Sequence, residues 1–367
     1  MVWFGATSGG RSESSDQLRR LLAATVPPLM NSDAAPQSKS GKMHAPGNGP
    51  IFATYYTILA VVGVPANVLT IAILSQGKCG LSKCITRYLV FMAVTDFLVI
   101  VTAVIFSRLR AIYFPVSILS TTPGCSLIIA LSSAAKDASV WLTVAFTFDR
   151  CVAICCQKLK LRYCTEKTAA VVIGTVCFLA CLRNVPFYFE FEPMYIIDTV
   201  PWFCSIKEIF YISVAWRVYE WSHRMLNPCV PFLLILMLNV LTVRYILAAN
   251  RARGRLLAQN NGEKQRDPEM QSRRKSIILL FAISGCFILL WATDVANFLF
   301  VRITANNYVS ASNSNDPKFI FQEGGYMLQF LSSCANTFIY AGTQTKFRQQ
   351  LKTTILYPFN IIRQRFK

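Results

Sequence analysis

The stretch VAFTFDRCVAICCQKLKLRYC, residues 144–164, places an acid and a base side by side inside an apolar segment. Asp149 and Arg150 follow an apolar run that ends at Phe148, and the chain stays largely apolar to Cys156 before it becomes basic. A soluble helix rarely buries such a pair, and a simple membrane anchor does not need one. The pair is therefore a candidate functional site whose role depends on the surrounding sequence.

The composition of the 367-residue chain is that of an integral membrane protein. Hydrophobic residues make up 54% and charged residues 15%, with a mean hydropathy of +0.42, whereas globular chains carry about 25% charged residues. Too few charges remain to cover an apolar core with a water-facing surface. The first 50 residues are instead polar and rich in Ser, Pro and Gly, which predicts a disordered tail over residues 1–50.

Seven segments are long and apolar enough to cross a bilayer as helices, which takes about 20 residues each. A count of six or eight stays open, because residues 208–219 are also mildly apolar. We predict an all-α membrane protein, a seven-transmembrane helix bundle with spans at about 51–74, 88–106, 124–156, 168–189, 222–247, 276–301 and 324–342.

The positions of the basic residues orient this bundle. Short cytoplasmic loops are enriched in Lys and Arg, and 21 of the 37 such residues fall in the alternate segments 75–87, 157–168, 248–275 and 343–367. The amino-terminal tail is therefore expected outside the cell and the carboxyl terminus inside, in a multi-pass protein of the plasma membrane. The net charge of +19 then attracts anionic membrane lipids, and no nucleic acid partner is required.

Cysteine positions agree with this orientation. Of the 13 cysteines, Cys125 and Cys204 fall on the outer side, where a disulfide can form and persist. We expect a disulfide that ties the start of the third span to the loop between spans four and five; two free thiols are the alternative. No CxxC motif and no cluster of Cys with His indicates a zinc site.

Short motifs in the spans resemble, in order and spacing, those of rhodopsin-like (class A) G-protein-coupled receptors over about residues 50–357. The motifs are GVPANVLT with Asn67, LVFMAVTDFLV with Asp96, Asp149-Arg150 placed 25 residues after Cys125, FILLWATD in span six and NTFIY in span seven. The resemblance implies a receptor that senses an extracellular small-molecule or peptide ligand and activates a heterotrimeric G protein.

Several positions depart from the family pattern. Cys151 replaces the Tyr of the Asp-Arg-Tyr motif, Thr293 and Thr337 replace the prolines of spans six and seven, and Asn239 replaces a span-five Tyr. Asn239 and the missing span-seven proline are shared with the group of probable G-protein-coupled receptor 139, which the stretch FDRCVAICCQKLKLRYCTEKTAA also resembles. That narrower resemblance implies an aromatic amino acid or neuropeptide-like ligand and a G protein of the Gq class.

The resemblance also assigns residues to the receptor switch, which falls on Asp149, Arg150, Asn239, Asn336 and Tyr340. In this interpretation Asp149 and Arg150 neutralise each other while the bundle is closed. When Arg150 is released, it turns into an inner crevice and receives the G protein.

Asp96 is the strongest candidate among the ionisable residues inside the spans, because charge at that depth is costly. The resemblance places Ser139, Ser333 and Asn336 around it, an oxygen-rich set that suits a hard cation. We expect an allosteric Na⁺ there and no other cofactor; the alternative is a protonated Asp96 that hydrogen-bonds between helices.

Lys136 and Asp137 lie about 21 Å outward from Arg150 along the third span, since each residue rises by 1.5 Å. That is the depth of the ligand cavity in the family. Neighbouring residues point about 100° apart, so one faces the cavity and the other a neighbouring helix. We expect Asp137, together with Asp294, to face the ligand; an ion pair of Lys136 with either acid is the alternative.

Other expected ligand contacts follow from the resemblance. Ser132 stands where amine receptors carry Asp, so a monoamine ligand is not expected, and Trp291 matches the aromatic residue at the cavity floor. The expected ligand-binding residues are Ser132, Lys136, Asp137, Trp291, Asp294, Asn297 and Glu323.

Residues 343–367 are predicted to form a short cytoplasmic amphipathic helix and a tail. The segment TKFRQQLKTTIL resembles the helix that lies on the inner leaflet in this family, with Phe347, Leu351 and Ile355 at positions i, i+4 and i+8.

Two other classes of protein compete with a receptor. A transporter or channel often carries inverted repeats or paired broken helices, and no such duplication is visible in the sequence. A membrane enzyme would need a motif such as HExxH or GxSxG, and neither His44 nor His223 lies in one. We therefore expect a receptor without enzymatic activity and keep a transporter or channel as the alternative.

Overall fold

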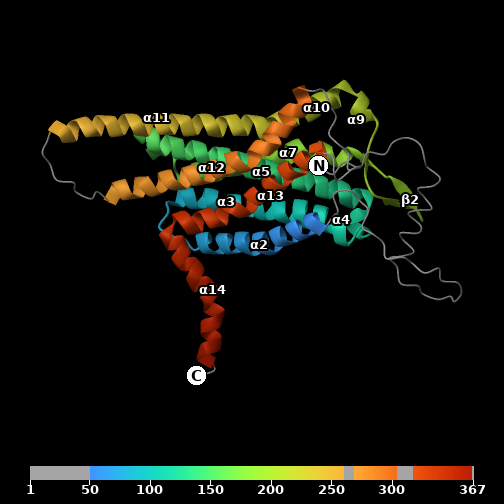
Figure 1. The fold of residues 1–367 in the computed structure, drawn as a ribbon, viewed down its shortest axis with the longest axis horizontal. Coiled ribbons are helices and arrows are strands. Elements are labelled where there is room, and N and C mark those ends of the chain that lie inside the picture. The colour runs from blue at the N-terminus through green and yellow to red at the C-terminus, as the bar shows by residue number, and fades with distance from the viewer. Residues whose placement is uncertain (1–49, 260–267, 304–316, 366–367) are drawn as a thin grey trace.

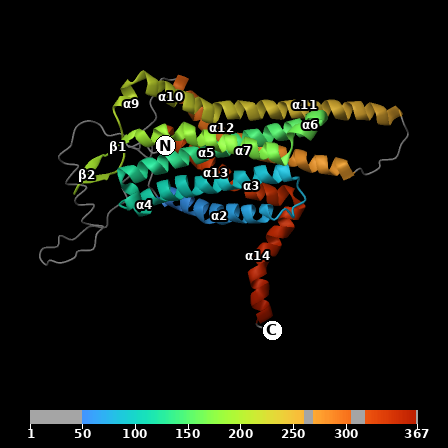
Figure 2. The same ribbon diagram turned by 180° about the vertical axis from the view of Figure 1, so that it is seen from behind.

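The computed structural model describes residues 50–259, 268–303 and 317–365, so the predicted tail at 1–50 lies outside the described residues except for Pro50. The described chain is a bundle of seven long helical segments (Figures 1 and 2). They are α2 (Pro50–Ser75), α3 (Lys83–Val99) continued by η1 (Ile100–Leu109) and α4 (Arg110–Tyr113), α5 (Thr122–Cys155), α7 (Glu166–Asn184) followed by α8 (Pro186–Phe189), α10 (Val214–Arg224) continued by η3 (Met225–Cys229) and α11 (Val230–Gln259), α12 (Pro268–Ile303) and α13 (Pro317–Thr343). The predicted all-α bundle is confirmed.

Six of these segments are long and apolar enough to cross a membrane. The seventh segment, α13, is not among the six because it is more polar, and its polar side chains are buried inside the bundle. Its inward face carries Gln322, Glu323 and Gln329, all buried against other helices, so its polarity faces the protein interior. By contrast, large apolar side chains are exposed on the outside of the bundle, as lipid contact requires; examples are Ile58, Val61, Phe178, Leu233 and Leu289.

The fifth segment begins earlier than the predicted start at residue 222. Its outer end is α10, which begins at Val214, so the mildly apolar stretch 208–219 extends an existing span and does not form an eighth. At the opposite end, α11 and α12 continue past the predicted limits 247 and 276 and project beyond the other helices (Figure 1). Hydropathy locates the part of a helix inside lipid, whereas backbone hydrogen bonding continues into water.

Two of the segments contain wider π-helical turns. In the second segment η1 covers Ile100–Leu109, and in the fifth η3 covers Met225–Cys229 and includes Pro228. Such turns rotate the side chains that follow them and are frequent at functional sites. Arg108 lies within η1, and Asn227 lies within η3, which begins directly after Arg224.

Close packing joins α2 to α13. A Cβ at Gly63 would collide with the Sγ of Cys334, so glycine permits the approach. Asn67 Nδ2 donates to the main-chain oxygens of Gly63 (3.0 Å) and Ser333 (2.9 Å). Thr337, which replaces the family's proline, shares a 2.8 Å hydrogen bond with the hydroxyl of Thr70.

The outer loop between the fourth and fifth segments covers the start of α5. It contains two short antiparallel pairs, β1 (Phe191–Glu192) with β4 (Ser205–Ile206) and β2 (Tyr195–Ile197) with β3 (Val200–Trp202). The predicted disulfide between Cys125 and Cys204 is confirmed. Phe203 adds two hydrogen bonds to the same region, its N–H to Ser120 O (2.8 Å) and its carbonyl from Thr122 Oγ1 (2.7 Å).

The remaining helices are the short η2 (Ile118–Ser120), α6 (Gln157–Tyr163) and α9 (Ile209–Ile212), and the longer α14 (Thr345–Arg365). Helix α14 follows α13 directly and turns away from the bundle (Figure 1). Phe347 is fully buried and packs edge-on against Tyr340 at 5.9 Å, whereas Ile355 is 48% exposed. The place of this helix on the inner leaflet stays a prediction.

Candidate functional site

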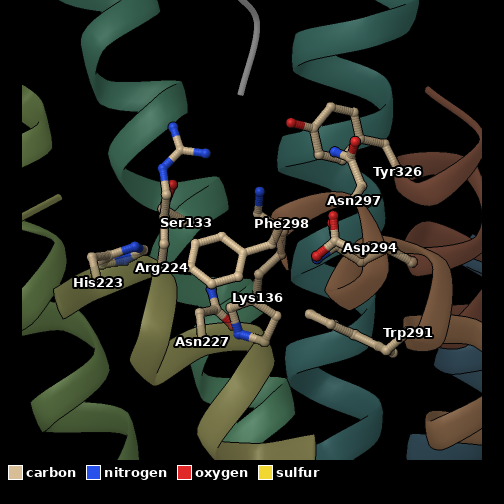
Figure 3. Close-up of a pocket in the computed structure, with 12 residues that line it drawn as sticks. Ser133, Lys136, His223, Arg224, Asn227, Trp291, Asp294, Asn297, Phe298 and Tyr326 are labelled. Carbon is tan, nitrogen blue, oxygen red and sulfur yellow. The ribbon is translucent and has the colours of Figure 1, made fainter. Parts of the chain in front are cut away.

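A cavity of about 80 Å³ lies in the outer half of the bundle, among α5, the fifth segment, α12 and α13 (Figure 3). Beside the cavity α13 packs closely on α12, since a Cβ at Gly325 would lie 3.4 Å from the backbone of Asp294. Four of the expected ligand-binding residues line the cavity: Lys136, Trp291, Asp294 and Asn297. Trp291 stacks on Phe287 with ring centroids 5.1 Å apart and donates from Nε1 to Ser332 Oγ at 3.1 Å.

Lys136 and Asp294 bring opposite charges to the cavity from two different helices (Figure 3). Their charges interact, but no ion pair within 4.0 Å joins Lys136 to Asp294 or to Asp137 in the described part of the chain. The ion pairs kept as an alternative for Lys136 are therefore not formed. A cation and an anion that face one cavity without direct pairing can each bind a ligand group.

Asp137 does not face this cavity, so the expectation that it is the ligand-facing acid is wrong. Its fully buried carboxylate forms an ion pair with Arg183 and accepts hydrogen bonds from Arg183 Nε at 3.0 Å and Asn184 Nδ2 at 2.5 Å. His223 Nε2 lies 3.4 Å away. Because successive helical residues point about 100° apart, Lys136 takes the cavity side of α5 and Asp137 the side next to the fourth and fifth segments.

Ser132 and Glu323 also lie away from the cavity lining. The Ser132 hydroxyl donates to Ile129 O within its own helix at 3.0 Å, and its neighbour Ser133 lines the cavity instead. Glu323 forms a buried ion pair with Arg108 at 3.3 Å. The Arg108 guanidinium also lies 5.7 Å from the ring centroids of Tyr56 and Tyr326. Glu323 therefore joins the second and seventh segments.

A second and smaller cavity, about 20 Å³, lies below Trp291 beside Asp96. Asp96 is buried, and its two carboxylate oxygens accept hydrogen bonds from Ser139 Oγ (2.6 Å) and Asn336 Nδ2 (2.8 Å). The Ser333 side chain also interacts with this carboxyl group. The structure thus brings together all four residues expected around a cation, and the Asp96, Ser139 and Ser333 oxygens fit the preference of a hard ion. The space exceeds the minimum of about 10–15 Å³ for one water molecule.

The inner end of α5 carries the buried Asp149–Arg150 ion pair. Arg150 donates from Nε to Asp149 Oδ2 at 2.9 Å and also pairs through Nη2 with the same oxygen. Nearby, Asn239 Oδ1 accepts from Ser284 Oγ at 3.1 Å, which joins α11 to α12. Tyr340 is buried against Phe347, and its hydroxyl has no hydrogen-bond partner within the described residues.

Residues 66–340 match the family described as 7 transmembrane receptor (rhodopsin family). The chain belongs to the rhodopsin family of seven-transmembrane receptors. It is accordingly a multi-pass membrane receptor and not an enzyme.

Two named relatives support this membership. The chain is 28% identical over 221 residues to a Drosophila melanogaster protein named FMRFamide receptor, a match that covers 54% of this chain and 38% of the fly protein. It is 23% identical over 314 residues to a Mus musculus protein named probable G-protein coupled receptor 142, covering 84% of this chain and 73% of the mouse protein. The resemblance to the probable G-protein-coupled receptor 139 group stays a prediction.

Three polar residues of the fifth segment are among the cavity-lining residues that the sequence analysis did not name as ligand contacts. His223, Arg224 and Asn227 all line the cavity from the fifth segment. A sequence pattern could have predicted two of them. His223 and Asn227 are spaced i and i+4 at the start of a membrane span, which puts both side chains on one helical face.

Glu190 lies where the fourth segment meets β1, between α8 and β1. Burial raises its pKa from 4.5 to about 7, and the like charge of Glu220 adds to the increase while Arg224 opposes it. Glu220 in turn accepts from Arg224 Nε at 2.9 Å. The charges of Glu220 and of the cavity-lining Arg224 therefore both act on Glu190.

The raised pKa of Glu190 predicts a pH dependence of receptor stability. The folded state binds this proton more tightly than the unfolded state, so the stabilisation is complete below pH 4.5 and is lost as pH rises through about 7. The full effect is about 3 kcal/mol, from about 1.4 kcal/mol per pKa unit. In detergent, the Glu190→Gln variant should lose less thermal stability than the wild type between about pH 5.5 and pH 8. Glu192→Gln, an exposed neighbour on β1, is the control; equal pH slopes in all three proteins would contradict the prediction.

Proposed function

We propose that this chain is a plasma-membrane receptor, with its amino terminus outside the cell, that binds an extracellular small molecule or peptide and activates a heterotrimeric G protein of the Gq class. The observation that carries the proposal is the arrangement along α5. This helix contributes Lys136 to the outer cavity and, about four turns further along, the buried Asp149–Arg150 pair at its inner end. A ligand that shifts the helices around the cavity can therefore change the environment of the ion pair.

The proposed switch follows from the energetics of a buried charge. Arg150 is held by Asp149 and covered by neighbouring helices, with its guanidinium 6.0 Å from the Phe146 ring centroid. Releasing it inside the bundle without a new partner is costly. A G-protein segment that supplies hydrogen-bond acceptors to Arg150 would stabilise the open state, and a ligand that favours the same state would act through the same equilibrium.

The lining of the outer cavity suggests the chemistry of the ligand. Lys136 and Arg224 supply positive charge, Asp294 supplies negative charge, and Trp291 and Phe298 supply aromatic surface. A molecule with an anionic group, a cationic group and a ring matches these features, as an aromatic amino acid or a peptide terminus would. The name of the fly relative, FMRFamide receptor, supports a peptide as the second possibility.

The Asp96 cluster is proposed to bind Na⁺ as an allosteric ion. The support is the convergence of Asp96, Ser139, Ser333 and Asn336 beside a small cavity under Trp291. An ion in this position would hold α3, α5 and α13 together and would oppose the rearrangement of the cavity floor.

Loss of Arg150 should abolish coupling. Cells that express the receptor are expected to release inositol phosphates and calcium on exposure to a compound from a library of aromatic amino acids and short peptides. Arg150→Ala should reduce the response about tenfold or more, since a charge-assisted hydrogen bond contributes about 1.5–3 kcal/mol. Arg217→Ala, which removes an exposed arginine of α10, should leave it unchanged. Purified protein that moves solute across liposomes without a G protein would instead support the transporter or channel alternative.

The two cavity charges should determine ligand potency. Asp294→Asn and Lys136→Gln are each expected to raise the half-maximal agonist concentration about 10- to 100-fold, because each removes one partner of a charge-assisted hydrogen bond. Asp137→Asn should instead lower the thermal stability of the purified receptor, because it weakens a buried ion pair and leaves Arg183 without its full counter-charge. Ligand potency that depends on Asp137 alone would reverse this assignment.

Sodium binding should stabilise the receptor. The melting temperature in sodium chloride is expected to exceed that in an equal concentration of potassium chloride, because an ion that binds the native state stabilises it by mass action. Asp96→Asn should remove the difference. Equal melting temperatures of the wild type in the two salts would rule out a selective sodium site.

A further inference from the structure

Two cysteine thiols contact the acid of the inner ion pair. Cys84 Sγ donates to Asp149 Oδ1 at 3.4 Å, and Cys164 Sγ donates to the main-chain oxygen of Asp149 at 3.6 Å. The two cysteines come from different elements. Cys84 lies in the first turn of α3, and Cys164 is the residue at which α6 ends. Asp149 is thus held from the second segment and from the second inner loop at the same time.

The two oxygens of the Asp149 carboxylate have separate partners. Both recorded hydrogen bonds from Arg150 go to Oδ2, whereas Oδ1 accepts from the Cys84 thiol. Cys84 is 3% exposed and Asp149 is 1% exposed, so bulk water does not compete for Oδ1. The thiol therefore fixes the plane of the carboxylate, and with it the direction in which Oδ2 meets the guanidinium.

We propose that Cys84 is a positioning residue of the receptor switch, whose thiol orients Asp149 toward Arg150 and thereby sets the ligand-independent activity. The inference rests on the proposed function, in which release of Arg150 opens the receptor. Cys84 touches neither the ligand nor the G protein in this account. It acts through Asp149.

A weak donor such as a thiol suits a contact that sets the level of ligand-independent activity. A thiol is a weaker donor than a hydroxyl. Cys84 therefore orients the carboxylate through a weaker hydrogen bond than a Ser or Thr would form. Cys164 remains available as a second donor at cytosolic pH, because burial and the neighbouring Asp149 raise the pKa of its thiol to about 12.

Loss of packing must be distinguished from loss of the hydrogen bond when Cys84 is replaced, and Cys79 provides the comparison. Cys84 and Cys79 both belong to the apolar cluster that includes Tyr88, Phe146 and Phe347, and both are buried. Cys79 makes no hydrogen bond to Asp149 in the described structure. Cys79→Ala therefore removes a similar thiol from the same cluster and is a matched control.

The first experiment measures ligand-independent inositol phosphate release in cells at equal surface expression. Cys84→Ala should raise it about two- to tenfold, the range for one net hydrogen bond. Cys84→Ser, which keeps a donor, should stay at or below the wild-type level, and Cys79→Ala should match the wild type. In an Asp149→Asn background, Cys84→Ala should add nothing further. The proposal is overturned if Ser raises the basal signal as much as Ala, if Cys79→Ala has the same effect, or if the effect persists without the carboxylate.

A second experiment does not depend on signalling. In the purified full chain, the rate at which a maleimide modifies Cys84 is followed by mass spectrometry of the peptide that contains it. Cys84 should react several-fold faster in Asp149→Asn than in the wild type, because the thiol loses its charged acceptor. Equal rates overturn the positioning role. If Asp149→Asn speeds the labelling of Cys84 but the wild-type receptor produces no second messenger, the contact between Cys84 and Asp149 is supported. In that case only the proposed coupling to a G protein is contradicted.

Discussion

The bilayer core contains no water to solvate charge, so ionisable side chains inside this bundle depend on polar partners within the protein. Asp137 pairs with Arg183, and Arg108 pairs with Glu323. Each pair joins segments that are distant in sequence, and in each the acid is buried. These pairs explain why the bundle tolerates charge at depth, and they restrict how its helices can be packed against one another.

Lys136 and Asp294 differ from these pairs, because both face a cavity and no direct ion pair joins them. A cavity that holds two such charges is costly in the absence of a ligand and favourable when a ligand neutralises both. The same physical rule that makes Asp137 structural therefore makes Asp294 a candidate ligand contact. The difference between the two acids is their position around the helices and not their chemistry.

Helix α5 connects the functional regions of the receptor. Its outer half contributes Lys136 to the cavity, its middle contributes Ser139 to the Asp96 cluster, and its inner end carries Asp149 and Arg150. Two residues that depart from the family pattern form hydrogen bonds to neighbouring helices. Thr337 hydrogen-bonds to Thr70 where a proline would leave no hydroxyl, and Asn239 accepts from Ser284. These contacts link neighbouring helices by side-chain hydrogen bonds at positions where the family uses a ring or a kink.

The sequence by itself indicated the membrane class, the bundle of helices and the disulfide of Cys125 with Cys204, because hydropathy and cysteine position can be read from local composition. The Asp149–Arg150 pair stood out as adjacent charges in an apolar segment, and the resemblance to the receptor family placed Ser139, Ser333 and Asn336 around Asp96. Only the tertiary structure decided that Lys136 and not Asp137 faces the cavity, that Glu323 pairs with Arg108, and that His223, Arg224 and Asn227 join the lining. The reason is rotational: sequence spacing gives the depth of a residue along its helix, whereas the direction of its side chain depends on how the helices turn, including the π-helical turns η1 and η3.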